Sequence, residues 1–379
     1  MSKLEHLTEE QLERLINEYY EGANIKQLIT KFEIKLIPSR LVQEFPPVVL
    51  EAECIYCGTK LIQTYQSRNT SNILSSPICP NCGHQKEEFC PCNTCNEYRK
   101  LKLEWENKRK SNLILNIYLP NEETMFPEEE LTLIELLYLA VLLRAGLDES
   151  MEYILPVKEY KNKLGPTDDI QNEIVLSLTN RQIIRPHISS PISAFKDDEN
   201  FPSTYYVYHV RYALNIKPID SDIKSLIHRL MHPVSDIFIK DKDFCFEMWK
   251  KISQGEVLEY LLYSMEKVKF SFSPGEKTLA VIDGLLESFS VSQIYNIIYR
   301  SIANATKYYQ ETGISRNHAA NLVVTNCQRS GEKAIAEGWK IKPYGRDFYC
   351  PQSILSELFF NRILNIGILG FDLPPTIDI

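Results

Sequence analysis

The first fifty residues carry hydrophobic side chains at the spacing of three short helices. Thr8 and Gln11 have the spacing of a capping box, and apolar side chains recur every three or four residues after them. Asn24 is suited to cap a second helix, and Pro38 to begin a third. We therefore predict helices over residues 9–21, 25–32 and 38–45.

Between residues 98 and 130 the pattern changes from helix to strand. The charged stretch 98–110 predicts a helix, whereas the alternating apolar residues of 112–119, followed by Pro120, predict a strand. Residues 121–130 are acidic and contain a proline, so we expect a linker there. The main domain boundary should lie at the same place, near 120–130.

A long apolar helix from Leu131 begins the next segment. It is followed by a segment around 157–164, a helix over 167–184, and strands over 184–187 and 205–214. This order of elements resembles that of a winged helix. Two aspartates, Asp168 and Asp169, open the presumed recognition helix and would face phosphates unfavourably, so we expect such a domain to meet protein rather than DNA.

The remainder of the chain, from residue 219 onwards, has mainly helical patterning. The expected helices cover 221–231, 243–264, 274–289, 292–312, 315–339 and 351–366. The predicted fold class is therefore mainly α with small β elements.

The bulk composition is ordinary for a globular protein, with 379 residues, 44% hydrophobic and 24% charged. No basic start is followed by an apolar run and a small-residue cleavage site. The most apolar run, 131–143, contains Glu135 and is too short to span a bilayer. We expect a cytoplasmic protein that makes no membrane contact.

The net charge of −8 is distributed unevenly along the chain. Residues 1–110 contain 15 Lys and Arg against 15 Asp and Glu, residues 111–230 contain 11 against 18, and residues 231–379 contain 16 against 17. Non-specific affinity for nucleic acid comes mainly from Lys and Arg that neutralise phosphates. Since no long basic block is present, any contact with duplex DNA must use a small local patch.

Seven of the ten cysteines lie within residues 54–95, and four of them form two identical motifs. Each motif is Cys-x-x-Cys-Gly, at Cys54/Cys57 and at Cys79/Cys82, with 21 residues between Cys57 and Cys79. Each turn places two thiolates on one side of a tight knuckle, and two knuckles supply the four soft ligands of tetrahedral Zn²⁺. The segment resembles a zinc ribbon, and four thiolates close the coordination shell, so we expect a structural rather than a catalytic site.

The residues that follow can supply a second site. His84, Cys90, Cys92 and Cys95 bring the number of candidate ligands to eight, as two four-coordinate zinc ions require. Two other arrangements fit the same residues. Cys79 and Cys82 can pair with Cys92 and Cys95 instead, or Cys90 can be a spare thiol.

The N-terminal helices resemble the helix-turn-helix of resolvase- and invertase-type recombinases. The resemblance rests on Leu7-Thr-Glu-Glu-Gln, on Tyr19-Tyr-Glu-Gly22-Ala-Asn-Ile-Lys-Gln-Leu28 and on Ile34, with Glu33 at the position of the turn glycine. It implies a DNA-binding protein of a bacterium or mobile element. The residues of suitable type for DNA contact are Lys31, Lys35, Ser39, Arg40 and Gln43. The other interpretation is a small helical bundle that packs on the zinc module or on a partner.

Common enzyme signatures are missing, including nucleotide-binding glycine loops, the zinc-protease His-Glu-x-x-His and the hydrolase Gly-x-Ser-x-Gly. The predicted helix 315–339 does place His318, Asn321 and Arg329 on one polar stripe, with Arg346 in the loop that follows. A polar stripe opposite an apolar one is usually a solvated face. An effector enzyme with a site around His318 is therefore only an alternative.

These observations predict a non-enzymatic, multidomain zinc protein that binds nucleic acid or acts as a regulator. The expected domains are a helix-turn-helix-like 1–47, a zinc ribbon with a following helix and strand at 48–120, a winged-helix-like 130–216 and a helical 219–379. A protein partner is expected as well as duplex DNA. The first alternative function is an adaptor or scaffold whose zinc ribbon meets only protein, which the balanced charge of residues 1–110 favours.

Overall fold

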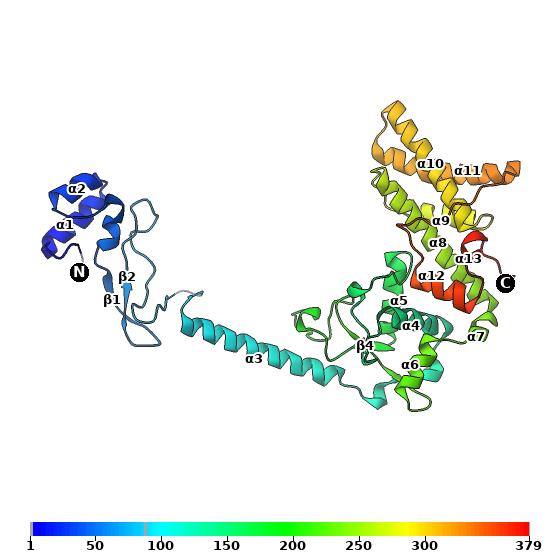
Figure 1. Cartoon of the computed structure of the whole chain (residues 1–379), viewed down its shortest axis with the longest axis horizontal. Helices are drawn as coiled ribbons and strands as arrows, with labels where there is room; N and C mark the ends of the chain where they lie inside the picture. The colour runs from blue at the N-terminus through cyan, green and yellow to red at the C-terminus, as the bar shows by residue number, and fades with distance from the viewer. Residues whose placement is uncertain (1–2, 87–88, 379) are drawn as a thin grey trace. The chain divides into compact units, whose positions relative to one another are not determined.

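The computed structural model describes residues 3–86 and 89–378, and its contacts divide the chain into an N-terminal unit, residues 1–110, and a C-terminal unit, residues 111–379. Helices contain 53% of the residues and strands 7%. The prediction of a mainly α chain with small β elements is confirmed (Figure 1).

Three short helical segments begin the N-terminal unit. They are α1 (Glu9–Tyr20), α2 (Ile25–Lys31) and a 3₁₀ helix, η1 (Pro38–Glu44). Thr8 and Gln11 form the predicted capping box, and the Asn24 side chain accepts a hydrogen bond at the start of α2. One leucine from each segment is buried in a shared core: Leu15, Leu28 and Leu41.

A short hairpin follows the three helices. Its strands β1 (Val48–Glu53) and β2 (Lys60–Gln63) pair antiparallel, with a register shift between Val49 and Glu53. Ile78 adds isolated bridges to Ile62 on one side and to Gln85 on the other. These bridges bring the second cysteine motif next to the first.

The chain continues as one long helix, α3 (Asn93–Tyr118), so the predicted strand over 112–119 is wrong. Alternating apolar residues suggested a strand, but the side chains that pack are Ile114 and Tyr118, one helical turn apart. Ile114 is buried, and the Tyr118 hydroxyl donates to the Pro202 carbonyl over 3.0 Å. The helix crosses the division between the units and ends two residues before Pro120, as the restriction on residues before proline requires.

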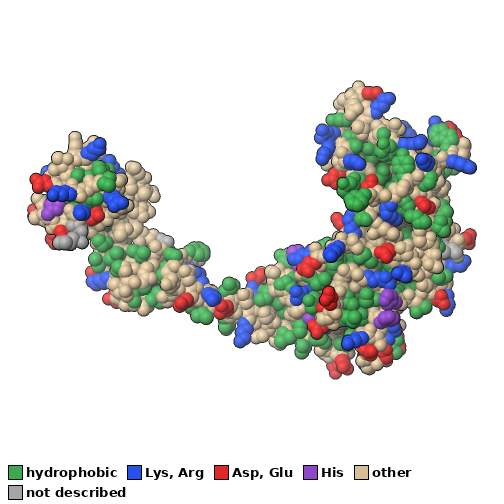
Figure 2. All heavy atoms as spheres, in the orientation of Figure 1, with side chains coloured by type: hydrophobic (Ala, Val, Ile, Leu, Met, Phe, Trp, Pro, Cys, Tyr) green, Lys and Arg blue, Asp and Glu red, His purple; other side chains and the backbone are tan. Residues whose placement is uncertain are grey.

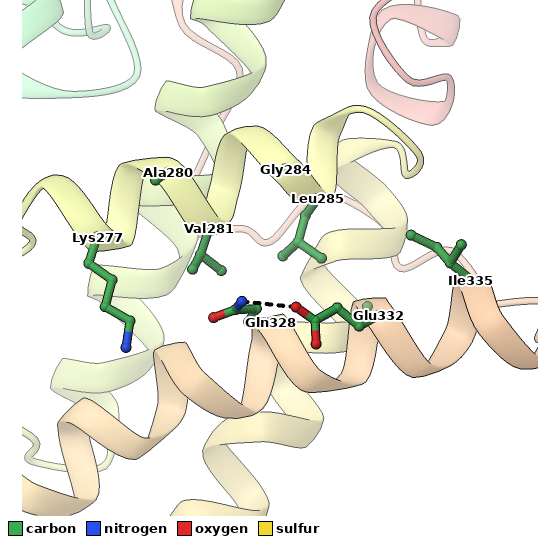
Figure 3. Close-up of a pocket in the computed structure, with 9 residues that line it drawn as sticks. Lys277, Ala280, Val281, Gly284, Leu285, Gln328, Glu332 and Ile335 are labelled. Atoms are coloured by element: carbon green, nitrogen blue, oxygen red, sulfur yellow. Dashed lines mark hydrogen bonds between the residues drawn. The ribbon is translucent and has the colours of Figure 1, made fainter.

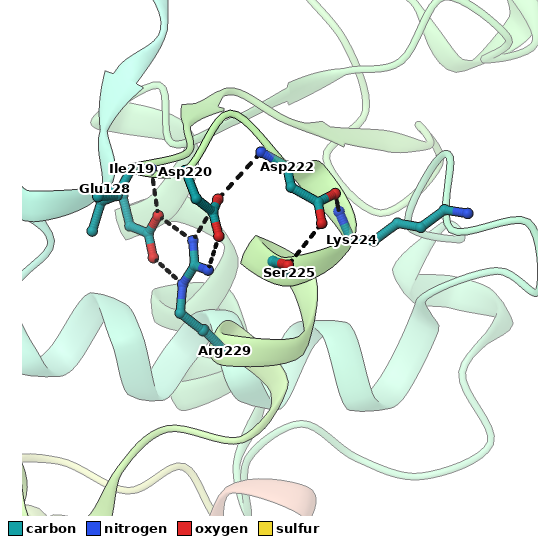
Figure 4. A network of polar contacts seen from close by, with 7 residues as sticks. All are labelled: Glu128, Ile219, Asp220, Asp222, Lys224, Ser225 and Arg229. Atoms are coloured by element: carbon teal, nitrogen blue, oxygen red, sulfur yellow. Dashed lines mark hydrogen bonds and ion pairs between the residues drawn. The ribbon is translucent and has the colours of Figure 1, made fainter.

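The predicted linker over 121–130 is also wrong, because this segment packs within the C-terminal unit. After a short 3₁₀ turn, η2 (Glu122–Thr124), strand β3 (Phe126–Pro127) pairs in parallel with β6 (Ile216–Lys217). Glu128, in the 3₁₀ turn η3 (Glu128–Glu130), forms a 2.8 Å ion pair with Arg229, which also contacts Asp220 at 2.7 Å (Figure 4). Glu128 therefore anchors this acidic segment to the C-terminal unit, whereas its other four glutamates are exposed.

The first core of the C-terminal unit surrounds α4 (Leu133–Gly146), whose residues from Leu137 to Leu143 are all buried. Thr132 and Glu135 form a capping box at its start. The neighbouring helices are α5 (Asp168–Asn180), α6 (Ile223–Met231) and α12 (Ile354–Leu358). This core therefore draws on both predicted ranges, 130–216 and 219–379.

The two strands predicted in this segment form an antiparallel pair, and both are shorter than predicted. They are β4 (Ile184–Pro186) and β5 (Tyr212–Leu214), and Ile154 adds an isolated bridge to Tyr212. Residues 205–211 do not join the sheet, because Tyr205 instead bridges to Phe195 and packs against its ring.

A second core is formed by the helices that follow. They are α8 (Lys242–Lys267), α9 (Glu276–Leu286), α10 (Val291–Thr312) and α11 (Arg316–Glu337), close to the predicted ranges. The first half of α8 lies in the first core and the second half in the second. The remaining short elements are η4 (Val157–Glu159), η5 (Ile192–Ala194), α7 (Ser235–Ile239), a π-helical turn (Phe359–Ile363) and α13 (Leu369–Asp372). Among the described residues, no helix is long and apolar enough to cross a membrane.

A buried ion pair fastens the loop after α11 to α8. Glu256, only 1% exposed, lies 2.9 Å from the Arg346 guanidinium and accepts a 2.7 Å hydrogen bond from the Ser356 hydroxyl. Both partners lie within the C-terminal unit, so the pair joins segments 90 residues apart in sequence.

We expect Arg346→Ala to destabilise the C-terminal unit by about 3–5 kcal/mol, because it leaves a buried carboxylate without its counter-charge. Urea unfolding followed by circular dichroism measures this loss. The control is Lys307→Ala, which removes an exposed i,i+4 partner of Glu311 and should leave the midpoint nearly unchanged. Equal urea midpoints for the two variants would contradict the conclusion that the buried ion pair stabilises the C-terminal unit.

Candidate metal centres

The two Cys-x-x-Cys-Gly motifs adopt the same backbone geometry. Gly58 and Gly83 have φ angles of 67° and 71°, in the left-handed region that a glycine adopts without strain. The N–H of each glycine donates over 2.9 Å to the carbonyl of the first cysteine of its motif, Cys54 or Cys79. The knuckle geometry that the sequence predicts is therefore present twice.

The four cysteines of these knuckles converge on one point. The Sγ atoms of Cys54 and Cys82 are 3.5 Å apart, those of Cys57 and Cys79 are 3.4 Å apart, and those of Cys57 and Cys82 are 3.8 Å apart. A tetrahedron of thiolates about 2.3 Å from Zn²⁺ has edges of about 3.8 Å. All four cysteines are free thiols, so the cluster can hold a metal ion.

His84, Cys90, Cys92 and Cys95 form a second cluster, in which the ligand atoms all lie within 4.8 Å of one another. His84 presents Nδ1, which lies 3.4 Å from the Cys95 sulfur and 3.9 Å from the Cys92 sulfur. Of the arrangements that the sequence left open, the geometry matches the one with four ligands in each of two sites. Cys79 and Cys82 lie in the first cluster, and Cys90 lies in the second.

The start of α3 positions the second cluster. Cys92 precedes the helix and Cys95 lies in its first turn, where the N–H of Cys95 is 3.4 Å from the Cys92 sulfur and stabilises a thiolate there. Arg99, one turn further along, donates to the Cys90 carbonyl. The long helix is thereby fixed to the metal-binding segment at its N-terminal end.

Tyr56 connects the two clusters, a role that sequence reasoning missed. It lies inside the first knuckle, yet its hydroxyl is 3.4 Å from the Cys95 sulfur and its ring packs edge-on against His84. The contact with the Cys95 sulfur raises the pKa of Tyr56 to about 12, which keeps the phenol protonated. No motif rule singles out the middle residues of a knuckle, so the sequence contained no signal for this contact.

Hydrogen bonds favour ionisation of one thiol in each cluster, whereas the pKa values of Cys82 and Cys92 are raised because burial and the neighbouring thiols outweigh their backbone hydrogen bonds. The Thr59 hydroxyl, 3.4 Å from the Cys57 sulfur, lowers the pKa of Cys57 to about 6. Burial opposes ionisation of Cys90, but the backbone N–H groups of Gln85 and Cys92 outweigh it and lower the pKa of Cys90 to about 6. Both thiols are therefore prepared as anionic ligands near neutral pH.

The donor sets decide what chemistry these centres can perform. Four thiolates, or three thiolates and one imidazole, are compatible with Zn²⁺ and complete a tetrahedral shell. A catalytic zinc needs an open position for water, and neither donor set leaves one. The geometry therefore supports structural centres.

The predicted DNA-contact residues occupy two different environments. Lys31 forms a 2.6 Å ion pair with Glu18 of α1. Lys35, Ser39, Arg40 and Gln43 are exposed, and within residues 3–86 and 89–378 neither Lys35 nor Arg40 forms an ion pair.

The residues of the alternative enzyme site are not gathered into one centre. His318 is exposed in the first turn of α11, and Arg346 is engaged with Glu256. Arg329 lines a different feature, a basic groove that includes neither of these residues.

A further hollow of about 420 Å³ lies between α9 and α11 (Figure 3). Its walls are mainly apolar, with Val281 and Leu285 facing a hydrogen bond of 2.9 Å from Gln328 to Glu332. Lys277 is the only other ionisable residue of its lining. No nucleophile with an adjacent base is present in this lining, so it offers no reaction centre.

Comparison with known proteins gives no relative for this chain. No family model, no curated protein and no solved structure matches it. The metal-binding geometry is therefore the firmest basis for assigning a function.

We expect mass spectrometry under native conditions to find two zinc ions on each chain. Cys54→Ser/Cys57→Ser should remove one ion and Cys92→Ser/Cys95→Ser the other, because each pair supplies half the ligands of one cluster. Cys245→Ser is the matched control, since Cys245 is a buried thiol of the C-terminal unit whose sulfur contacts the Phe238 carbonyl. A single zinc on the unmodified chain would show that the second cluster does not bind.

Proposed function

We propose that the chain is a non-enzymatic, zinc-binding regulatory protein whose N-terminal unit binds duplex DNA. The observation that carries the proposal is the exposed group of Lys35, Ser39, Arg40 and Gln43. Its two cations lack ion-pair partners in the described part of the chain and are free to neutralise phosphates.

The geometry of η1 aligns these side chains. Residues three apart lie one above the other on a 3₁₀ helix, so Arg40 and Gln43 share an edge. Leu41 points the other way and is completely buried in the core of the unit. Arginine and glutamine are side-chain types that form paired hydrogen bonds with base edges in the major groove.

Lys31 is the weaker candidate among the five residues. Its ammonium is already neutralised by Glu18, so a phosphate would have to compete with that carboxylate. The turn before Lys35 also supports the resemblance to a helix-turn-helix. Glu33 has a φ of 51°, and it stands where recombinases of this type have a glycine.

The zinc ribbon supports the DNA-contact segment mechanically. Arg68, between the two knuckles, donates to the carbonyls of Tyr19 and Ala23 at the end of α1. Tyr65, two residues after β2, packs edge-on against Phe45, the residue after η1. In this proposal zinc is a structural cofactor whose removal loosens the DNA-contact segment.

The decisive experiment compares duplex-DNA binding by the zinc-loaded chain at low and high salt. Lys35→Ala/Arg40→Ala should weaken binding. It should also reduce the steepness of log affinity against log salt by about 2, because two phosphate contacts are lost. Arg14→Ala/Lys60→Ala is the control, with the same charge change at two cations that already have carboxylate partners.

Zinc is counted in every variant, which separates loss of contact from loss of the metal. Equal weakening by the control pair would contradict a local DNA patch. Absence of binding at low salt, with both zinc ions retained, would contradict the proposal itself.

The second candidate function is a protein adaptor. The observation that favours it is the exposure of apolar side chains around the metal-binding segment, where Ile55 is 77% exposed and Phe89 80% exposed. The order of α4, α5 and the β4–β5 pair is like that of a winged helix, and the acidic start of α5 would also suit a protein partner. Retained zinc without any DNA binding is the outcome expected of an adaptor.

A further inference from the structure

The C-terminal unit contains a basic groove between α10 and α11. The cavity is about 650 Å³ in volume, and residues 339–342, which follow α11, also line it. Its lining includes five cationic side chains and no carboxylate. The cationic residues are Arg300, Arg329, Lys333, Lys340 and Lys342.

Helical spacing explains how these side chains meet. Asn296, Arg300 and Asn304 recur every four residues along α10, and Arg329 and Lys333 are four apart on α11. Each helix therefore turns one polar stripe toward the groove. Figure 2 shows Lys and Arg side chains on the surface that these helices form.

The positive charge of the groove is largely uncompensated. Lys333 lies 3.8 Å from Glu337, whereas Arg300, Arg329, Lys340 and Lys342 form no ion pair among the described residues. Cations lining one cleft raise its potential and concentrate anions in it. The arrangement fits a ligand that carries several negative charges.

Two further features make the ligand more specific than an inorganic anion. Asn296 is 2% exposed and donates to the Lys342 carbonyl over 2.7 Å, but its own carbonyl oxygen has no hydrogen-bond partner. A ligand N–H or O–H group would satisfy that oxygen. Trp339 is half-exposed in the lining, with the Lys333 ammonium 4.8 Å from the centre of its ring, and the exposed part of an aromatic ring can stack on a base.

We propose that this groove binds single-stranded nucleic acid, with phosphates on Arg300 and Arg329 and a base stacked on Trp339. The proposal rests on the nucleic-acid-binding function proposed above but uses residues of the C-terminal unit alone. A groove between two packed helices suits an extended strand, whereas duplex recognition is assigned to the N-terminal unit.

The test measures binding of a labelled single-stranded oligothymidylate to the full-length chain at several salt concentrations. Arg300→Ala/Arg329→Ala should reduce the steepness of log affinity against log salt by about 1.4, as expected for the loss of two phosphate contacts to a single strand. Trp339→Ala should weaken binding about tenfold through lost stacking. Lys307→Ala/Arg316→Ala is the control on the same helices, because neither residue lines the groove.

Lys35→Ala/Arg40→Ala should leave binding of the single strand intact. If that variant loses duplex binding but keeps single-strand binding, the two sites are distinct. The duplex proposal and the groove proposal can then be contradicted separately. Unchanged affinity of Arg300→Ala/Arg329→Ala, or an equal loss in the control, would overturn the groove proposal. Circular dichroism confirms that each variant is folded.

An independent observation concerns the exposed apolar stripe on α3. Tyr98, Leu101 and Trp105 are each about two-thirds exposed, at 65%, 64% and 65%, and the stripe continues to the exposed Leu115. Tyr98, Leu101 and Trp105 are three and four residues apart, and Leu115 lies ten residues after Trp105, so at 100° per residue all of them fall on one side of the helix. Figure 2 shows hydrophobic side chains exposed along this helix.

The stripe points away from the contacts that α3 makes within the chain. Cys95 and Arg99 turn toward the second metal cluster, and Ile114 and Tyr118 turn toward the first core. At 100° per residue, all four side chains lie at least 60° outside the arc of the stripe. A helix without tertiary packing is only marginally stable in water. Burial of this apolar face against a partner would therefore stabilise α3.

The charges beside the stripe identify the partner as a second copy of the chain. With Tyr98 and Trp105 at the first heptad position and Leu101 at the fourth, Glu97 and Glu104 flank one side and Lys102 and Arg109 the other. In a parallel pair, Glu97 faces Lys102 of the other copy, and Glu104 faces its Arg109. An antiparallel pair would set glutamate against glutamate.

The seam also contains two polar residues, which limit the number of strands. Asn112 falls at a first heptad position, where a buried asparagine favours two strands and one register. Lys108 falls at a fourth position, where its apolar stem packs and its ammonium reaches solvent beside Glu104. We infer that α3 forms a parallel two-stranded coiled coil with α3 of a second copy.

Sedimentation of the full-length chain at micromolar concentration should show a dimer. Leu101→Asp/Trp105→Asp should produce a monomer with both zinc ions retained, whereas Leu103→Asp, at an exposed position off the seam, should remain dimeric. Glu97→Lys/Glu104→Lys and Lys102→Glu/Arg109→Glu should each weaken self-association, and their mixture should restore it. A monomeric unmodified chain, or a mixture that does not associate, would overturn the inference.

Discussion

The convergence of two cysteine knuckles is the constraint on which the N-terminal unit depends. The hydrophobic core of the ribbon consists of Cys54, Leu61 and Cys79, with Leu50 and Cys82 packed beside them. So small an apolar core cannot offset the entropy of ordering about forty residues, whereas a metal ion held by two distant knuckles would. Two of the three core residues belong to the first cluster that could hold a metal ion.

The contacts of the two clusters extend beyond the candidate ligands. Arg68 holds the end of α1, and Tyr56 joins the first cluster to the second. The second cluster in turn fixes the start of α3 through Cys95. The proposed DNA-contact residues and the proposed dimer seam therefore both depend on the clusters, although no residue of the patch or of the seam is a candidate ligand.

The C-terminal unit is stabilised differently, by helices that share apolar surface. Helix α8 contributes to two successive cores, and the buried Glu256–Arg346 pair fastens the loop after α11 to it. Helix α10 packs against α8, and α11 packs against α9. This packing uses their apolar sides, so their polar stripes line the groove. The side chains that stabilise the fold and those of the proposed binding surface therefore lie mainly on different faces of the same helices.

The sequence by itself determined the features that depend on neighbouring residues. The eight candidate metal ligands, the cap at Thr8 and most helix ranges follow from short-range spacing and hydrogen bonding, and the structure contains the cap and gathers the candidate ligands into clusters. Only the tertiary structure decided which candidate ligands lie together, that α3 continues through residues 112–118, and that residues 121–130 pack through Glu128 and Arg229. It also paired Arg346 with Glu256 and brought α10 and α11 together around a basic groove. Each of these outcomes depends on contacts between residues far apart in the chain, and local patterns carry no information about such contacts.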